Sequence, residues 1–504
     1  MNVTYLIIGA GPGGLQLGYF LHKHNYNYLI IEKNATAGSF FSTFPHGNTL
    51  ISINKKHTGS DNGEFNLRHD WNSLLNDEGL LFTNYSDRLY PSKDDLYRYL
   101  NDFAKSLNIQ YDTEVLKISK SETDYSVLTN KGVFTCQKCI IATGLTPNKT
   151  SEYHYGNLPK DFFNDKTRFI NKKVLIIGSG NSAYEIANLL VEHASNIIIS
   201  AKQFKIASET HYAGHLRSVY LPFLDTFTLK SLNGIHARNI FTEKSYIKKG
   251  DKYFFPNLYE GFVSEYDYVF FCTGYQPHCQ NLFDFPVSMD ISTNNKYPLL
   301  NYQYESINNS NLFFIGTCMH GKDYQKSAGG FIHGFRYLIR YLYYNLSSSI
   351  VKHEFYDINS LIDLSFERIK ISSSLYQMYG IMGDCIFYCL EKNKFIYIED
   401  VTLEWLQHYF VNKLSTDFLF LTLSYGIKPH DFNDLIANFT KYEEKFLHAR
   451  IELFQKENNK MKIMDRFNFD EQIILDFSHS KYREKLERII MGQYSHHVSS
   501  TIFP

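Results

Sequence analysis

The chain has 504 residues, and its 51 Lys and Arg nearly balance 52 Asp and Glu, for a formal net charge of −1. This balance gives no reason to expect nucleic acid or an anionic membrane as a partner. Apolar residues make up 44% of the chain, but no apolar run approaches the roughly 18 residues of a membrane span. Because a strand pattern starts directly after Met1, with no room for a secretory signal, we expect a cytoplasmic protein of about two to four domains.

The N-terminal residues predict a dinucleotide-binding unit. An apolar strand over Val3–Ile8 leads into the glycine-rich turn Gly9–Gly14, and a helix follows to about His24. A second strand, Tyr28–Ile31, ends in Glu32, which is placed to bind ribose hydroxyl groups. The glycines of such a unit allow a tight turn, a close approach to the pyrophosphate and helix–strand packing. The candidate cofactor contacts of this unit are Gly9, Gly11, Pro12, Gly14, Glu32 and Lys33.

The same pattern recurs in the middle of the chain. Val174–Ile177 is predicted as a strand, the turn Gly178–Ala183 opens a helix to about Glu192, and Asn196–Ser200 forms the next strand. This strand ends in Ser200-Ala201-Lys202 in place of an acid, and a hydroxyl beside a cation favours the 2′-phosphate of NADP. We therefore expect NADPH; the alternative is that Lys202 only solvates a strand end. The candidate contacts here are Gly178, Gly180, Asn181, Ser182, Ser200 and Lys202.

Three further strands end in small turns that let the backbone approach a ligand or cross between domains. They are predicted over Cys139–Gly144, Tyr268–Gly274 and Leu312–Thr317. After the third comes Ser327–Gly330 and an amphipathic helix to about Tyr344. Two glycine fingerprints with interleaved strand–turn units are much more specific than either fingerprint alone. The candidate contacts in these turns are Thr143, Gly144, Thr273, Gly274, Gly316, Ser327 and Gly329.

The order of these units predicts an α/β fold with two Rossmann-like dinucleotide-binding domains, the second inserted into the first. We expect an FAD-binding domain over residues 1–165 and 276–346 and an NADPH-binding domain over residues 166–275. The remaining residues, 347–504, form a C-terminal extension for which we expect a mainly helical structure.

The expectation for the extension depends on its apolar periodicity. Phe446–Phe454 and Tyr482–Met491 carry helical periodicity, whereas the apolar run Phe418–Leu423 is compatible with a strand or a helix. We assign no chemistry to the extension.

With both fingerprints placed, the chain resembles the class B flavin-containing monooxygenases. The stretch Gly178–Glu185 is similar to their nicotinamide motif, in which Asn-Ser follows the second glycine. Glu32 followed by Gly38-Ser39-Phe40 is similar to their acid, glycine and aromatic arrangement beside the flavin. The resemblance implies that Ser39 and Phe40 contact FAD, that the Val115 backbone meets adenine, and that Asn54 lies near the flavin ring.

A narrower resemblance, spanning most of the chain, points to an animal branch of FAD-dependent oxidoreductases that belongs to endoplasmic-reticulum-associated degradation. Its residues include Leu50–Lys55, Glu64–Leu74 and Lys326–Tyr337. The sequence departs from that branch because it shows neither a secretory signal nor a KDEL-like end. It also departs from the monooxygenase identifier motif, since Phe162–Asp165 lacks the glycine and histidine, which argues against Baeyer–Villiger chemistry in particular.

The resemblance implies a monooxygenase that consumes NADPH and O2. NADPH would reduce FAD, a flavin C4a-hydroperoxide would form, and one oxygen atom would pass to the amine nitrogen or sulfur of a small substrate. The amide of Asn54 would steady the peroxide by hydrogen bonding; the alternative is that Asn54 only caps a turn.

Other functions stay open. Cys136 and Cys139 form a C-x-x-C pair that would serve an NAD(P)H:flavin or disulfide oxidoreductase, although its place at the start of a strand favours ordinary buried thiols. An oxidase is a further alternative, and so is a flavoprotein scaffold that binds a protein partner through residues 347–504. No metal-ligand constellation is expected, and the sequence leaves homo-oligomerisation open.

Overall fold

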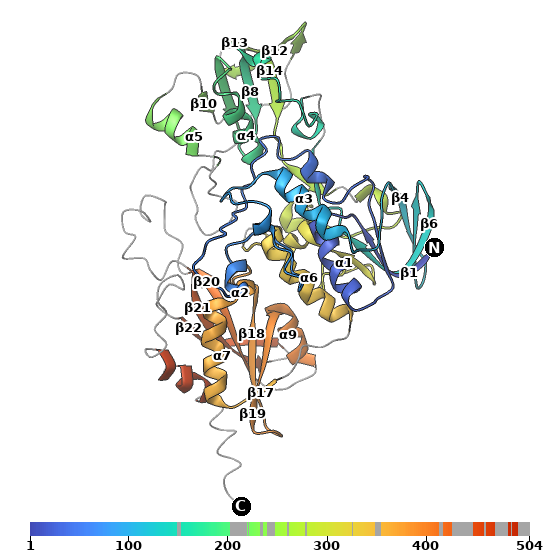
Figure 1. Ribbon diagram of the computed structural model, residues 1–504, viewed down its shortest axis with the longest axis vertical. Helices are drawn as coiled ribbons and strands as arrows, with labels where there is room; N and C mark the ends of the chain where they lie inside the picture. The colour runs from blue at the N-terminus through green and yellow to red at the C-terminus, as the bar shows by residue number, and fades with distance from the viewer. Residues whose placement is uncertain are drawn as a thin grey trace, which may run out of the picture.

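A computed structural model gives the structure of the protein. The residues it describes are 1–148, 153–201, 219, 221–231, 235–238, 247–259, 262–277, 280–324, 326–347, 354–412, 417–425, 447–457, 460–468, 482–484 and 486–491. The second glycine-rich unit lies at one end of the long axis, the first unit in the middle and the C-terminal extension at the other end (Figure 1). Within these residues no helix has the length and apolar character needed to cross a membrane.

The first sheet has seven strands, in the order β3-β2-β1-β6-β5-β4, and β16 pairs with the end of β6. Strands β1 (Asn2–Ile8), β2 (Tyr28–Ile31) and the second half of β6 (Gly132–Ile141) run parallel, as the fingerprint predicts. The other elements are β3 (Ile109–Gln110), β4 (Val115–Lys120), β5 (Tyr125–Thr129), β16 (Leu312–Phe314), α1 (Pro12–Lys23), α2 (Gly63–Leu67), α3 (Lys93–Ala104), α6 (Ile332–Leu346), η1 (Ser39–Ser42), η2 (Phe82–Asn84), η8 (Ile291–Thr293) and η9 (Gly316–Asp323).

The second sheet is fully parallel, with the order β10-β9-β8-β14. Helix α4 (Asn181–Leu190) follows β8 (Lys173–Ile177) directly and leads to β9 (Asn196–Ser200), which confirms the predicted second unit. Other elements between residues 153 and 282 are β10 (Ile235–Arg238), β11 (Ile247–Lys249), β12 (Lys252–Tyr259), β13 (Phe262–Tyr266), β14 (Tyr268–Phe271), α5 (Leu221–Phe223), η3 (Tyr155–Asn157), η4 (Thr167–Phe169), η6 (Leu224–Leu229) and η7 (Gln280–Leu282).

The chain passes between the two sheets twice, and the two crossings pair with each other. β7 (Leu145–Pro147) and β15 (Tyr275–Pro277) form a two-stranded antiparallel sheet. On this basis we propose the domain division expected above: an FAD domain over residues 1–165 and 276–346, with an NADPH domain over residues 166–275 inserted in it.

The C-terminal extension corrects the sequence-based expectation. Its core element is a six-stranded antiparallel sheet in the order β17-β19-β18-β20-β21-β22, so the described part of the extension is not mainly helical. The strands are β17 (Glu354–Tyr356), β18 (Met382–Cys389), β19 (Lys394–Thr402), β20 (Phe418–Tyr425), β21 (Leu447–Glu457) and β22 (Lys460–Asn468). The helices are α7 (Ile358–Ile371), α8 (Ser373–Gln377) and α9 (Leu403–Asn412).

The error came from the choice of period. Residues 447–454, expected to be helical, lie in β21, and the run Phe418–Leu423 lies in β20. The apolar residues of β21 alternate with polar ones, which is the period of a strand, and within residues 447–454 only Arg450 is not buried. The helical expectation for Tyr482–Met491 is confirmed where this segment is described, at residues 482–484 and 486–491.

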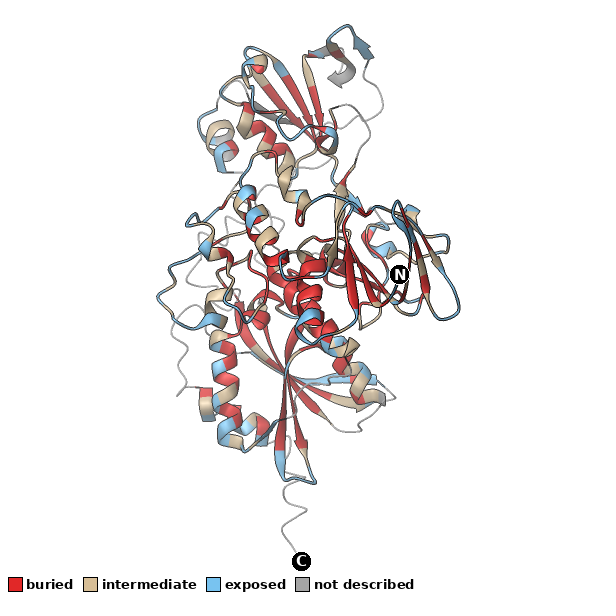
Figure 2. Cartoon of the chain, turned by 45° about the vertical axis from the view of Figure 1, so that its right-hand side comes forward, coloured by how far each residue is buried: buried red, intermediate tan, exposed pale blue. Residues whose placement is uncertain are grey.

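The extension shares its hydrophobic core with the first unit. Figure 2 shows buried residues running without interruption from the central helices into the sheet of the extension. One buried cluster joins Leu338 and Leu342 of α6 to Met382 of β18, Ile398 of β19 and Leu406 of α9. Removing the extension would therefore expose apolar surface of α6 to water.

Candidate active site

The carboxyl ends of the parallel strands bring together most of the residues predicted for the first site. Ile8 at the end of β1 pairs with Ile31 of β2 and with Ile141 of β6, and Ile141 also pairs with Phe314 of β16. The turns that follow these strands therefore meet at one edge of the sheet, which is where open α/β sheets bind their ligands. The predicted residues at this edge are Gly9, Gly11, Pro12, Gly14, Glu32, Lys33, Thr143, Gly144 and Gly316.

The glycines of the first turn are required by close backbone contacts. A Cβ added at Gly9, where φ is +109°, would lie 2.7 Å from the Ala142 carbonyl oxygen. One added at Gly14 would lie 2.0 Å from the Gly9 oxygen, and one at Gly13 would lie 2.8 Å from the Gly316 Cα. At Gly11 an added Cβ would meet no described atom within 4 Å. The turn is therefore tight on its protein side and open where a pyrophosphate would approach.

Glu32 organises the polar side of this edge. Its buried carboxylate accepts a hydrogen bond from the Ala10 amide at 2.9 Å and contacts the Ser39 hydroxyl at 3.3 Å. The Thr113 amide donates to the Glu32 carbonyl at 2.8 Å, which brings the start of β4 at Val115 beside it. Ser39 and Val115 therefore lie with Glu32, whereas Lys33 and Phe40 are exposed.

The second glycine-rich unit repeats this geometry. Ile177 at the end of β8 pairs with Ser200 of β9 and with Phe271 of β14, so the residues that follow these strands meet at one edge. At Gly178, where φ is +116°, an added Cβ would lie 2.2 Å from the Cys272 carbonyl oxygen. At Gly180 an added Cβ would meet no described atom within 4 Å. The edge carries Gly178, Gly180, Asn181, Ser182, Ser200, Thr273 and Gly274. Lys202 lies outside the described residues.

Both edges fit a dinucleotide, since each has an open glycine and a buried polar atom in need of a partner. The Thr143 hydroxyl at the first edge and the Asn181 side-chain oxygen at the second are buried without a hydrogen-bond partner among the described residues. Such atoms are costly unless a ligand or water completes them. The start of α4 at Asn181 also places free amide groups where a phosphate would lie.

Asn54 is held by the backbone in a fixed orientation. Its side-chain nitrogen donates to the carbonyl oxygens of Ser86 at 2.6 Å and Arg88 at 3.4 Å. Its oxygen is buried and has no partner within the described part of the chain. The amide hydrogens expected to steady a peroxide are therefore already used, and the side chain offers a hydrogen-bond acceptor instead.

Ser327 and Gly329 lie in the turn before α6, and sequence reasoning missed the carboxylate that shapes this turn. Buried Asp323 accepts a hydrogen bond from the Gly329 amide at 2.7 Å and contacts the His320 ring nitrogen at 3.1 Å. A Cβ at Gly329 would collide with the Asp323 carboxylate. Ser327 donates to the Gln377 carbonyl of the extension at 3.3 Å. The only sequence signal for this carboxylate was Asp323 at the end of η9, and its partners could be found only from the fold.

A second group missed from the sequence joins the two units. The Tyr155 hydroxyl donates to Glu185 of α4 at 3.0 Å, and His46 of the first unit contacts the Tyr155 carbonyl at 3.1 Å. Burial raises the pKa of Glu185 to about 7 and lowers the pKa of His46 to about 4. Glu185 belongs to the Gly178–Glu185 motif, yet only the fold shows that Tyr155 links it to His46 of the first unit.

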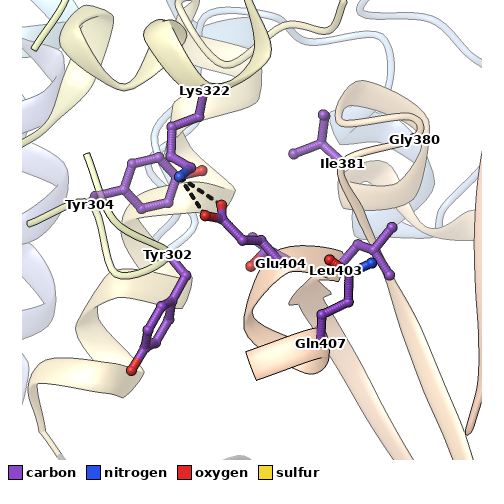
Figure 3. Close-up of a pocket in the computed structure, with 9 residues that line it drawn as sticks. Tyr302, Tyr304, Lys322, Gly380, Ile381, Leu403, Glu404 and Gln407 are labelled. Carbon is purple, nitrogen blue, oxygen red and sulfur yellow. Dashed lines mark hydrogen bonds and ion pairs between the residues drawn. The ribbon is translucent and has the colours of Figure 1, made fainter. Parts of the chain in front are cut away.

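The junction with the extension contains a pocket of about 200 Å³. Figure 3 shows Lys322 of η9 reaching across it to Glu404 of α9, with an ion-pair distance of 2.6 Å, while Tyr302 and Tyr304 form one wall. Lys322 follows the Gly316 turn by six positions, so the extension contacts the segment that carries the first cofactor edge.

The C-x-x-C pair is unsuited to thiol exchange. Cys136 and Cys139 of β6 are both fully buried, and the hydrogen bond from Cys136 together with burial raises the pKa of Cys139 well above its usual range. Exchange requires an accessible thiolate, so these thiols behave as core residues.

We accordingly expect Cys136→Ser and Cys139→Ser to keep NADPH oxidation, measured per bound FAD, within about twofold of the wild-type rate. Thermal unfolding of the same samples separates a stability loss from a catalytic one. A fall of about tenfold or more in the rate of NADPH oxidation in both variants, with FAD still bound, would instead support a catalytic role for the cysteine pair.

Comparison with known proteins agrees with this geometry. Residues 6–316 match the pyridine nucleotide-disulphide oxidoreductase family. FAD-dependent oxidoreductase domain-containing protein 2 of Mus musculus is 33% identical over 455 residues, which cover 80% of this chain and 67% of that protein. A flavin-containing monooxygenase from Stenotrophomonas maltophilia has the same fold, with a TM-score of 0.51 at 17% identity over 69% of this chain and 99% of its own.

A bacillithiol disulfide reductase from Bacillus cereus also shares the fold, with a TM-score of 0.51 at 20% identity over 69% of this chain and 100% of its own. The family match and the two cofactor edges make FAD and a pyridine nucleotide the cofactors of this enzyme. The chain therefore belongs to the pyridine nucleotide-disulphide oxidoreductase family and is a flavin monooxygenase-like flavoprotein.

Proposed function

We propose that this flavoprotein is an NADPH-consuming monooxygenase that transfers one oxygen atom to an amine nitrogen or a sulfur atom of a small substrate, by way of the flavin C4a-hydroperoxide. The observation that carries the proposal is the burial of Cys136 and Cys139. With this pair sealed in the core, a disulfide inside the FAD domain is a poor acceptor for electrons from reduced flavin, which favours O2 as the acceptor.

NADPH is the proposed reductant because the second fingerprint ends in Ser200 and Lys202 where an acid would select NAD. Ser200 is buried at the carboxyl edge of the second sheet, and its carbonyl accepts a hydrogen bond from the Gly178 amide at 2.8 Å. This contact ties the end of β9 to the phosphate-binding turn.

Asn54 is the proposed active-site side chain, with a role that differs from the first expectation. Because its side-chain nitrogen already donates hydrogen bonds to two backbone carbonyls, its side-chain oxygen would accept a hydrogen bond from the reduced flavin or from the bound oxygen species. The backbone bonds keep this acceptor in place before the reaction, which is the arrangement that costs least reorganisation.

The test is to reduce the purified enzyme with NADPH without oxygen and then admit O2 in a stopped-flow spectrometer. A flavin–oxygen adduct that lasts for seconds, and product from an amine or sulfide, would support the proposal. Immediate return to oxidised flavin with stoichiometric peroxide would indicate an oxidase instead. Equal kcat/KM values for NADPH and NADH would contradict the cofactor preference alone.

We expect Asn54→Ala to shorten the life of the oxygen adduct by roughly fivefold, the equivalent of one hydrogen bond of about 1 kcal/mol. Peroxide released per NADPH should rise accordingly, and stopped-flow absorbance with a peroxide assay measures both. Asn27→Ala, at an exposed position just before β2, is the matched control and should change neither. An unaltered adduct lifetime in Asn54→Ala would leave Asn54 a structural residue.

A further inference from the structure

The segment from α2 to Ser73 lies between the extension and the backbone around Asn54. It pairs directly with that backbone: the Lys55 amide donates to the His69 carbonyl at 3.0 Å, and the Trp71 amide donates to the Ile53 carbonyl at 3.1 Å. Asn54 lies between these two bonds and forms a bridge with Asp70. A shift of the segment would therefore displace Asn54.

The extension holds this segment through Arg68, which is 3% exposed. The guanidinium donates to the Ile369 carbonyl at 2.7 Å and to the Ser372 carbonyl at 3.0 Å. These carbonyls lie at the C-terminal end of α7, where the last peptide groups have no partners inside the helix and favour a cation. In return, the Gln377 side chain donates to the Arg68 carbonyl at 2.8 Å.

Two more contacts fix the ends of the segment. The Ser373 amide donates to Glu64 at 2.7 Å, at the start of α2. At the other end, fully buried Arg336 of α6 donates to the carbonyl oxygens of Leu67 at 2.7 Å, Asp70 at 3.0 Å and Ser73 at 2.7 Å. Hydrogen bonds thus hold the segment to the extension on one side and to α6 on the other.

We propose that Arg68 is a positioning residue: held by the extension, it fixes the position of Asn54 through residues 69–71. The C-terminal extension is thereby part of the site at which reduced flavin reacts with oxygen. The inference rests on the role proposed for Asn54. It gives the extension an influence on the flavin reaction that acts through Arg68 and Asn54, so the extension need not contact the cofactor.

The extension contacts the FAD domain elsewhere, which supplies a matched control. Arg340 of α6 forms an ion pair with Asp400 of β19, and among the described residues its guanidinium donates no hydrogen bond to residues 63–73. Arg340→Met removes a partly buried arginine from the same junction by the same substitution. It should lower the midpoint of thermal unfolding without changing the reaction of reduced flavin with O2.

The experiment is a double-mutant cycle on the rate constant for reoxidation of the reduced flavin by O2, measured in full-length wild type, Arg68→Met, Asn54→Ala and the double variant. We expect Arg68→Met to change this rate constant about fivefold in the wild-type background but by less than about twofold in the Asn54→Ala background. Anaerobic reduction by NADPH and FAD content should stay near wild type, and Arg68→Lys should restore part of the effect.

Additive effects of the two substitutions, or no effect of Arg68→Met, would overturn the inference. An effect of Arg340→Met as large as that of Arg68→Met would also overturn it, since the whole junction and not Arg68 would then be responsible. Because reoxidation is measurable whether or not product forms, a wild type that only releases peroxide would refute the monooxygenase proposal and still allow the cycle to be read.

Discussion

Replacing Gly14 by alanine is expected to abolish FAD binding by disrupting the turn itself. The new Cβ would lie 2.0 Å from the Gly9 carbonyl oxygen, a backbone atom that cannot move without displacing β1 from α1. Overpacking at such a contact costs about 3 kcal/mol or more. The purified variant should be colourless and should unfold at a lower temperature than wild-type apoprotein, as absorbance and thermal unfolding will show.

Gly11→Ala separates cofactor contact from folding. No described atom lies within 4 Å of a Cβ built there, and the backbone is extended with φ at −77°, so the protein itself accommodates the methyl group. The stability of the apoprotein should change by less than about 1 kcal/mol. FAD affinity should fall by roughly tenfold, because the methyl group occupies the space left for the pyrophosphate. If Gly11→Ala lowered the stability of the apoprotein as much as Gly14→Ala does, Gly11 would not be a position that faces only the cofactor.

Glu185→Gln is expected to make the protein more stable than wild type above about pH 7. Burial raises the pKa of Glu185 to about 7 from its ordinary value of 4.5, so the folded state holds a proton that the unfolded chain releases. The stability that this proton contributes is complete below pH 4.5 and is lost as the pH rises through about 7.

The two pKa values correspond to a difference on the order of 3 kcal/mol between wild type and Glu185→Gln at high pH. Glutamine keeps an oxygen to accept the Tyr155 hydrogen bond, so the packing between the units is retained. Urea unfolding between about pH 5 and about pH 8 measures the difference. Glu192→Gln, at an exposed position just after α4, should leave the pH dependence unchanged. Parallel stability curves for wild type and Glu185→Gln would show that Glu185 is charged in the folded state throughout this range.

The local sequence determined the two cofactor edges. Glycine, and no other residue, tolerates the contacts of Gly9 with Ala142 and of Gly178 with Cys272, so these positions could be identified from the spacing of glycines between a strand and a helix. Uninterrupted apolar runs identified the buried parallel strands, because both faces of such strands are covered and favour apolar side chains.

Contacts between distant residues were decided by the tertiary structure alone. Arg68 meets α7 about 300 positions later in the chain, and Glu185 accepts a hydrogen bond from Tyr155, which in turn contacts His46 of the first unit. Neither partner is signalled by local propensity or period, because a buried charge depends on which segments the fold brings beside it. The extension was misassigned for a related reason: the alternation in β21 becomes decisive only when β20 and β22 pair with it on both sides.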